Sequence, residues 1–528
     1  MIDAIIEGGR IFDGVSTVPM QTDLAIVGDR VALIGDLAER DAHERIDARG
    51  RVLAPGFIDV HSHSDELWLA NPRCEGKIMQ GVTTEIGGNC GSSIAPLHGL
   101  AFERKQEDLT HLRVDAAWHD LAEFFTLVEH NGVALNVATL IGLGTTRRCV
   151  RGDREGRLEE EELRAQLAFV REGIEQGGLG VSSGLIYVPS RYAGLDELVA
   201  CACEARAAGA PRYVSHLRDE GDALLEAVDE ALDVGRLADV AVQCSHHKAA
   251  GKKNWGKVHQ SLANIDRARS NGFAVHTDVY PYVASWTDLA TILPEETLFG
   301  GREAALVRLS DPELVVALAL RLELERGDTW HDVLITGGLS ERNAELAGRR
   351  LDEIAHAWRL RPARAALRLL LEERLEPQAI FFTMNEDDVA TVLSAEFTCV
   401  GSDASARALH GITAQGVPHP RTYGTFPRVF GRYVRQRKTL ELGEAIRRMT
   451  SLPAEIFGLV KRGRIEVGAY ADLVVFDPET IVDTATYERP FSYPRGIGAV
   501  FVNGKAVVRN GSPTGALPGR ALRNGVAR

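Results

Sequence analysis

The chain has 528 residues and a mass of 57.5 kDa, which suffices for one large domain with accessory parts. Its composition, 45% hydrophobic and 25% charged, is that of an ordinary globular protein and argues against disorder. The net charge of −14 argues against sequence-independent binding of nucleic acid or of an anionic membrane surface.

The first residues, "MIDAIIEGGRIFDG", lack the basic flank and apolar core of a signal peptide. No run of about 18 apolar residues follows, so we expect a cytoplasmic protein that does not span a membrane. The 7 cysteines are scattered and odd in number, which disfavours a disulfide framework. Each thiol therefore needs its own explanation.

The two ends of the chain share one pattern of short hairpins. Residues 1–54 alternate β-branched runs with turns, and residues 459–528 return to that pattern in "GRIEVGAYADLVVFDP" and "GAVFVNGKAVVRNG". Asn503 and Gly504, between two apolar runs, indicate a type I′ turn. We expect both ends to form one small β domain.

Between these ends, strand-like runs alternate with helical stretches, which predicts an α/β fold with a (β/α)8 barrel. The candidate strands are "GFIDVHSH", "VTTEIGGNC", "ALNVATLIG", "GLGVSSGLIY", "PRYVSHLRD", "VAVQCSHHK", "FAVHTDVYPY" and "FTCVGSDAS". Seven fall in 55–285, and the eighth, with closing helices, falls in 396–458. Residues 286–395 are too many for one connection and predict an inserted lid or subdomain with part of the barrel.

Potential metal ligands stand at the ends of several of these strands. The motif "HSH" closes the first strand, and its two-residue spacing places both imidazoles on one face. Barrel enzymes carry their chemistry at the carboxyl ends of strands, where imidazole, thiolate and carboxylate together suit zinc. The candidate ligands are His61, His63, Cys90, His216, His246 and Asp403.

Each candidate also has a simpler interpretation. The first two histidines could lie on the surface, His216 could cap a helix, and Asp403 could be an N-cap. Cys90 could be a buried inert thiol or a nucleophile, although no convincing base motif accompanies it. Strand parity favours His246 over His247, because His246 shares a face with Cys244. The joint occurrence of these residues at strand ends favours a metal site.

Several longer segments resemble the amidohydrolase superfamily, and within it the N-acyl-D-amino-acid deacylase (D-aminoacylase) family. They are "PGFIDVHSH", "TTEIGGNCGSS", "GLGVSSGLIYVPS", "SHHKAAGKKNWGK" and "HPRTYGTFPRVFG", and the resemblance covers essentially the whole chain. Many binuclear members of the superfamily use a carboxylated lysine on strand four. Because "GLGVSSGLIYVPS" has no lysine, another residue must bridge any second metal.

The resemblance implies a tightly bound zinc ion held by Cys90, His216 and His246. It also implies a weaker second position, formed by His61 and His63 with Cys90 and Asp403. Zinc lowers the pKa of bound water to about 7 and polarises an acyl carbonyl. Asp403 is then expected to act as general base and afterwards as general acid.

The resemblance further implies that Arg421, Lys248 and Tyr280 bind the α-carboxylate of the substrate. Tyr187 is a candidate donor to the carbonyl oxygen. Trp286 stands where a serine or threonine would be expected to assist carboxylate binding. Either Ser285 takes that role, or Trp286 lines a pocket for an aromatic side chain.

The activity implied is hydrolysis of N-acyl-D-amino acids, small-molecule substrates, to a carboxylate and a free D-amino acid. One alternative is a cyclic amidase similar to hydantoinase or dihydropyrimidinase, disfavoured by Cys90 and by the missing lysine. Another is a non-catalytic scaffold with the same fold, disfavoured by the six retained candidate ligands. The sequence predicts neither the preferred side chain and acyl group nor the oligomeric state.

Overall fold

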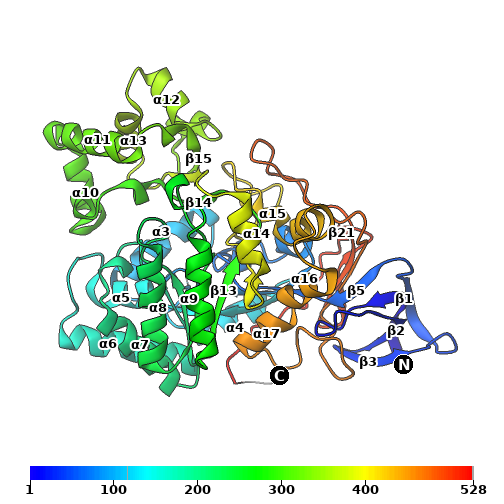
Figure 1. Cartoon of the computed structure of the whole chain (residues 1–528). Coiled ribbons are helices and arrows are strands. Elements are labelled where there is room, and N and C mark those ends of the chain that lie inside the picture. The colour runs from blue at the N-terminus through cyan, green and yellow to red at the C-terminus, as the bar shows by residue number, and fades with distance from the viewer. Residues whose placement is uncertain (116, 526–528) are drawn as a thin grey trace.

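A computed structural model describes residues 1–115 and 117–525. It contains a barrel of strands and helices, a β sheet beside it and a mostly helical lobe above it (Figure 1). Among the described residues, no helix is both long enough and apolar enough to cross a membrane.

The sheet beside the barrel is built from both ends of the chain, which confirms the expected β domain. The two halves join where β5 and β18 pair antiparallel, and Asn503 and Gly504 turn between β19 and β20 with φ values of 46° and 77°, as a type I′ turn requires. Its strands are β1 (Ile2–Ile11), β2 (Met20–Val27), β3 (Arg30–Gly35), β4 (Ala42–Asp47), β5 (Val52–Pro55), β18 (Leu473–Phe476), β19 (Ile497–Val502), β20 (Lys505–Arg509) and β21 (Ser512–Pro513).

The barrel strands pair in parallel throughout. Leu140 alone separates β8 from β9, so these two segments occupy one strand position and connect two sheets. A parallel bridge between Ser62 and Ala404 joins the ends of the first and last strands and closes the ring at eight positions. The strands are β6 (Phe57–Asp59), β7 (Val82–Gly87), β8 (Asn136–Thr139), β9 (Ile141–Gly142), β10 (Val181–Gly184), β11 (Arg212–His216), β12 (Ala241–Cys244), β13 (Val275–Val279) and β17 (Thr398–Val400).

Amphipathic helices cover the outside of this ring. In α8 the residues Leu224, Val228, Ala231 and Val234 recur at helical spacing and are buried, while the opposite face is charged. The helices near the barrel are α1 (Leu67–Ala70), α2 (Glu75–Ile78), α3 (Gly99–Leu112), α4 (Leu121–Asn131), α5 (Leu143–Arg151), α6 (Glu160–Glu175), α7 (Leu195–Ala207), α8 (Leu224–Ala238), α9 (Val258–Ser270), α14 (Glu386–Ser394), α15 (Arg421–Arg428), α16 (Leu442–Met449) and α17 (Ser451–Phe457).

The inserted lobe has a core of its own, formed by residues such as Leu322, Trp330, Ile354 and Leu370. It contains a small antiparallel sheet that the sequence did not predict, with strands β14 (Ser285–Asp288), β15 (Val333–Gly337) and β16 (Gln378–Phe381). Around this sheet lie α10 (Gly301–Ser310), α11 (Pro312–Arg326), α12 (Leu351–Trp358) and α13 (Pro362–Glu372). The strand β14 also borders a cavity at the carboxyl ends of the barrel strands, so the lobe contributes to the wall of that cavity.

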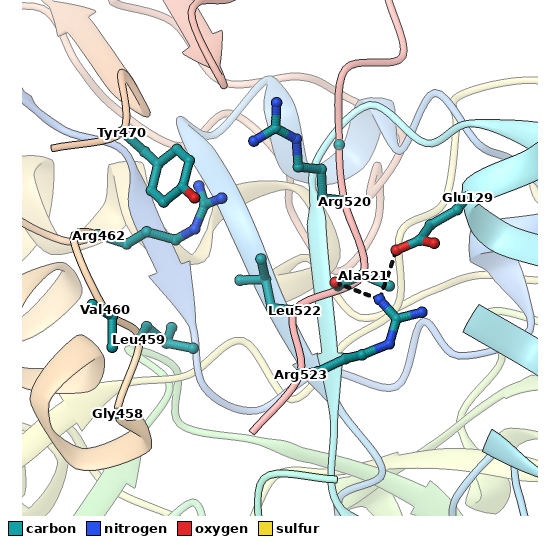
Figure 2. Close-up of a pocket in the computed structure, with 11 residues that line it drawn as sticks. Glu129, Gly458, Leu459, Val460, Arg462, Tyr470, Arg520, Ala521, Leu522 and Arg523 are labelled. Carbon is teal, nitrogen blue, oxygen red and sulfur yellow. Dashed lines mark hydrogen bonds and ion pairs between the residues drawn. The ribbon is translucent and has the colours of Figure 1, made fainter. Parts of the chain in front are cut away.

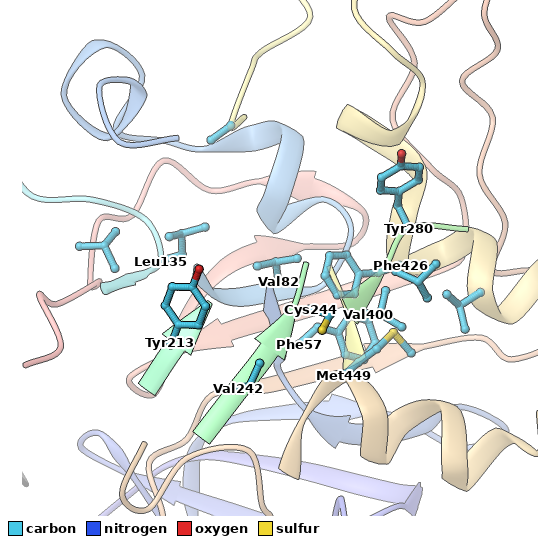
Figure 3. Packing of buried hydrophobic residues seen from close by; sticks show 14 of the residues in the cluster. Phe57, Val82, Leu135, Tyr213, Val242, Cys244, Tyr280, Val400, Phe426 and Met449 are labelled. Carbon is cyan, nitrogen blue, oxygen red and sulfur yellow. The ribbon is translucent and has the colours of Figure 1, made fainter. Parts of the chain in front are cut away.

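The main apolar core packs the barrel strands against their neighbours (Figure 3). Phe57 on β6 stacks on Phe426 of α15, with ring centroids 5.7 Å apart. Both side chains are fully buried, and Val82 and Met449 belong to the same cluster. Burying an aromatic side chain of this size contributes about 1.5–3 kcal/mol to the stability of the fold. This packing holds the barrel strands firmly in place.

Candidate active site

The six candidate ligands converge at one end of the barrel. Cys90 Sγ lies 3.2 Å from His61 Nε2 and 3.5 Å from His246 Nε2. Asp403 Oδ1 lies 3.6 Å from the same His61 Nε2 and 3.1 Å from His63 Nε2. The ends of four strands thus bring a thiol, imidazoles and a carboxylate into one cluster, as the barrel topology requires.

His216 completes the cluster from β11. Its ring centroid lies 4.4 Å from that of His246. Both of its ring nitrogens are buried, and neither has a hydrogen-bond partner among the described residues. A buried polar atom without a partner costs about 1–3 kcal/mol, so this imidazole is suited to a ligand that the protein itself does not supply.

Three candidate ligands adopt a left-handed backbone, which is rare for residues other than glycine. The φ values are 52° at Cys90, 33° at His246 and 49° at Asp403. Such conformations cost about 1–3 kcal/mol each and persist where the surroundings impose them, often at functional sites. The small neighbours of Cys90 serve this packing, because a Cβ added at Gly184 would lie 2.0 Å from the carbonyl oxygen of Cys90.

The surroundings favour the charged forms of the two acids in the cluster. Burial alone would raise the pKa of the Cys90 thiol, but the His61 charge and the neighbouring imidazoles of His216 and His246 hold it well below its usual value. For Asp403, burial is likewise outweighed, here chiefly by Arg421, whose Nη2 lies 2.9 Å from Oδ2, so the pKa of this carboxyl is also well below its usual range. A thiolate is the form of cysteine that binds metals.

Two acidic residues of the site escaped the sequence analysis. Asp278 on β13 lies 3.3 Å from His61 Nδ1 and accepts hydrogen bonds from the backbone N–H of His246 and from Gln243. Such a carboxylate fixes the tautomer of a metal-binding histidine and leaves its other nitrogen free for the metal. The only available signal was an acid at an inward position of the seventh strand.

Glu220 is the second missed residue. It lies 2.9 Å from His246 Nδ1, 3.8 Å from His216 Nε2, and pairs with Lys248. Despite burial, the charges of Lys248 and His246 hold the pKa of Glu220 far below its usual value. Its position four residues after His216, in "SHLRDE", was the signal that could have indicated it.

The predicted substrate residues border a cavity of about 560 Å³ above the cluster. The guanidinium carbon of Arg421 lies 4.5 Å from the centroid of the Tyr280 ring, and Lys248 Nζ lies 5.7 Å from the same centroid. The hydroxyl of Tyr187 hydrogen-bonds to Thr287 at 2.8 Å. All four predicted residues line this cavity, as do Ser285 and Trp286.

The two adjacent histidines of "SHHK" separate as strand parity indicated. His246 faces the cluster, whereas His247 hydrogen-bonds to Ser261 of α9 at 2.7 Å. Burial lowers the pKa of His247 to about 4, so it is neutral at physiological pH. It serves packing between β12 and α9.

The donor set fits a zinc ion. Overlapping groups of three donors, each compact enough for one ion, contain all six predicted ligands together with Glu220. Thiolate and imidazole with an acidic neighbour are the combination that zinc prefers over harder cations. No single compact group holds Cys90, His216 and His246 together, so the assignment of the tight position to these three stays a prediction.

A second cavity lies away from this cluster and has a different character (Figure 2). Arg462, Arg520 and Arg523 line it, and each has an acidic partner: Asp472, Asp29 and Glu129 respectively. These arginines fasten the C-terminal segment and the β domain to the barrel. The strand-end cluster is therefore the better candidate for chemistry.

A closed parallel barrel with thiolate, imidazole and carboxylate donors at its strand ends defines a metal-dependent hydrolase of the barrel type. Residues 44–508 match the model of the amidohydrolase family, and the chain belongs to that family. Full-length relatives place it in the D-aminoacylase branch, which confirms the resemblance seen in the sequence.

The similar proteins are related over nearly their whole lengths. N-acyl-D-glutamate deacylase of Alcaligenes xylosoxydans xylosoxydans is 39% identical over 99% of this chain and 96% of its own. D-aminoacylase of the same organism is 36% identical over 98% and 97%. The structure of N-acyl-D-glutamate deacylase from Bordetella bronchiseptica, complexed with zinc and a phosphonate inhibitor, is 35% identical, with a TM-score of 0.84 and 99% coverage of both chains.

Proposed function

We propose that the protein hydrolyses N-acyl-D-amino acids to a carboxylate and a free D-amino acid, using zinc at the strand-end cluster. The observation that carries the proposal is the Cys90 thiolate among three histidines, one of which, His216, has no hydrogen-bond partner among the described residues. Relatives that share this chain's length are named as deacylases of N-acyl-D-amino acids. The zinc-containing relative binds a phosphonate described as a mimic of the tetrahedral intermediate.

A bound zinc would polarise the acyl carbonyl and make water a competent nucleophile near neutral pH. Asp403 lies at the edge of the cluster and is held ionised by Arg421, so it is ready to accept the proton of the attacking water. The same carboxyl can then return the proton to the departing amine nitrogen. This assigns Asp403 as general base and then general acid.

The other cavity residues position the substrate. One wall is formed by Arg421, Lys248 and Tyr280. These residues can bind the α-carboxylate, because a guanidinium donates two parallel hydrogen bonds to a carboxylate. The ring of Tyr187 lies next to that of His216, with ring centroids 5.1 Å apart, and its hydroxyl can donate a hydrogen bond to the acyl oxygen. Asp278 and Glu220 orient the ligand histidines that they contact.

The two alternatives are less well supported. Solved dihydropyrimidinase from Brevibacillus agri NCHU1002 is 18% identical to this chain with a TM-score of 0.57, a likeness of fold alone. A cyclic amidase with a bridging lysine does not fit β10, which reads "VSSG". A scaffold would have no need to retain six converging donors, three of them in strained backbone conformations. We also infer a cytoplasmic location and a small-molecule substrate, and the acidic composition argues against nucleic acid or membrane partners.

The test is the initial rate of amine release from matched D and L enantiomers of N-acetylated leucine, phenylalanine, tryptophan, glutamate and aspartate. We expect release from D substrates alone. Zinc-containing protein that releases amine from none of these pairs would refute the proposal and turn attention to cyclic amides.

A further inference from the structure

One of the arginines in the cavity wall that the proposed mechanism does not use has no acidic partner. Arg407, in the loop after β17, borders the catalytic cavity. It also borders a neighbouring cavity of about 230 Å³, which is distinct from the cavity of Figure 2. Trp286 and Gln378 border both cavities, so the three residues form the partition between them. The partition therefore forms part of the wall of the cavity that also contains the metal cluster.

Arg407 differs from the other arginines of this wall in its partners. Three others each pair with an acid: Arg148 with Asp153, Arg302 with Glu376 and Arg421 with Asp403. In the described part of the chain, no carboxylate forms an ion pair with Arg407. Its Nη1 instead donates to the carbonyl oxygen of Gln415 at 2.8 Å.

Burial without a counter-ion is unfavourable for this guanidinium. Its side chain is partly buried, and burial lowers the pKa of Arg407, with only Tyr423 acting in the opposite direction. A desolvated charge that lacks a partner is costly, and a carboxylate brought by a ligand would remove that cost. The arginine is therefore prepared for an anion that this chain does not provide.

The position of Arg407 relative to Arg421 sets the size of that anion. Both guanidinium carbons lie over the ring of Trp286, that of Arg407 at 5.3 Å and that of Arg421 at 6.0 Å from its centroid. The indole is fixed, because its Nε1 donates to Thr336 Oγ1 at 2.9 Å. A ligand with one carboxylate on Arg421 and a second a few bonds away would span the indole and reach Arg407.

The acids of the cavity act on groups other than Arg407. Asp403 pairs with Arg421, and Glu220 pairs with Lys248. Burial and the charges of Glu376 and Asp108 raise the pKa of Asp288 to about 6, against the effect of Arg302. None of these acids is among the groups that act on Arg407, so its positive charge is not offset by any carboxylate of the described residues that line the cavity.

We propose that Arg407 is a specificity-determining residue that selects N-acyl-D-amino acids with an acidic side chain, glutamate before aspartate. The α-carboxylate lies on Arg421, the side-chain carboxylate on Arg407, and the methylene groups lie on the face of Trp286. This inference rests on the proposed function and adds the class of side chain to it. It also assigns Trp286 a role, as a floor for aliphatic carbons and not as part of a pocket for an aromatic side chain.

The test compares N-acetyl-D-glutamate with N-acetyl-D-glutamine, which have the same shape and differ in charge. We expect kcat/KM of the wild type to favour glutamate by about 30-fold, the size of effect that a buried charge-assisted pair supports. In Arg407→Gln the value for glutamate should fall by about the same factor, while the value for glutamine stays within about threefold. Arg342→Gln removes an arginine of the inserted lobe whose side chain is 70% exposed, and it should change neither value.

Three results would overturn the inference. Equal use of both substrates by the wild type would show that no cation selects the side chain. An equal loss for both substrates in Arg407→Gln would place Arg407 at the α-carboxylate or in the fold. Failure of zinc-containing wild type on both substrates and on N-acetyl-D-leucine would remove the proposed function itself, whereas activity on leucine and glutamine with none on glutamate would contradict only the side-chain assignment.

Discussion

Two buried clusters of charged residues share the strands β6, β7 and β17, and their partners differ. The lower cluster is centred on Lys77, whose ammonium group lies 2.7 Å from Asp59, 3.0 Å from Glu85 and 2.7 Å from the Ser402 hydroxyl. These side chains are fully buried. Every charge in this cluster has its counter-charge within the chain, so the cluster pins β6, β7 and β17 together.

The upper cluster begins one to five residues farther along the same strands, at His61, Cys90 and Asp403. It contains imidazole nitrogens without partners and three residues with left-handed backbone. Structural and functional charges in this barrel therefore differ in whether the chain itself supplies their partners. Charges that pair with one another stabilise the packing of the strands. Polar groups without a partner and residues in imposed backbone conformations indicate a site for a ligand.

The sharpest way to break the upper cluster alone is Asp403→Asn. The amide keeps the shape of the side chain but cannot accept the proton of the attacking water, so we expect kcat/KM to fall by about 10³-fold. The zinc content should not change, because the other donors remain. Rates on an N-acetyl-D-amino acid and metal analysis of the same preparation check this, and near-normal turnover would remove the proposed role of Asp403.

Breaking the lower cluster should affect stability first. Lys77→Met leaves Asp59 and Glu85 buried without their cation, and breaking a buried pair in this way costs about 3–5 kcal/mol of unfolding free energy. Urea unfolding of the zinc-loaded protein measures the loss. The matched control is Lys253→Met, whose side chain is 72% exposed and pairs with Asp222; its cost should stay below about 1 kcal/mol. Equal effects from both substitutions would contradict the structural role of the lower cluster.

The contrast between the clusters also explains how much the sequence could predict. Ligand candidates such as His61 and Cys90 stood out because they end apolar strands, and the barrel topology then brings strand ends together. Asp278 and Glu220 stayed hidden because an acid within a strand, or after one, has no distinctive spacing. Lys77 lies on the short helix α2, and only the folded barrel shows that its charge meets Asp59 and Glu85.

The inserted lobe shows a second limit. Its presence followed from the length of the segment before the eighth strand, but its antiparallel sheet depends on pairing between β14, β15 and β16, which are far apart in sequence. Arg407 is similarly invisible in the sequence. Its lack of a counter-ion emerges only when the lobe and the loop after β17 are placed around Trp286.

Metal removal should also distinguish the two clusters, with a smaller effect on stability. A ligand bound at 100 times its dissociation constant adds about 2.7 kcal/mol to folding, so for a chain of this length we expect chelation to lower the unfolding temperature by about 2–3 °C. Cys90→Ala should unfold at a temperature that chelation barely changes. Calorimetry or dye-monitored melting measures both shifts, and a large chelator effect that persists in Cys90→Ala would place the bound metal elsewhere.

The smallest expected effect concerns Tyr187, which lies at the cavity side of the upper cluster. Tyr187→Phe removes one donor to an acyl oxygen that the metal already polarises, so we expect kcat to fall about tenfold, less than for a sole oxyanion donor. Tyr192→Phe is the control, since the Tyr192 hydroxyl reaches only the carbonyl oxygen of Leu298. An unchanged kcat in Tyr187→Phe would leave that tyrosine a packing role.

The most direct test of the central claim is the zinc content of wild type and Cys90→Ala, purified without added metal, together with their rates on an N-acetyl-D-amino acid. We expect about one zinc per chain and D-specific turnover in the wild type, and loss of both in the variant, because a thiolate is the strongest zinc donor in the cluster. Retention of zinc and of D-specific turnover in Cys90→Ala would contradict the assignment of the strand-end cluster as the catalytic metal site.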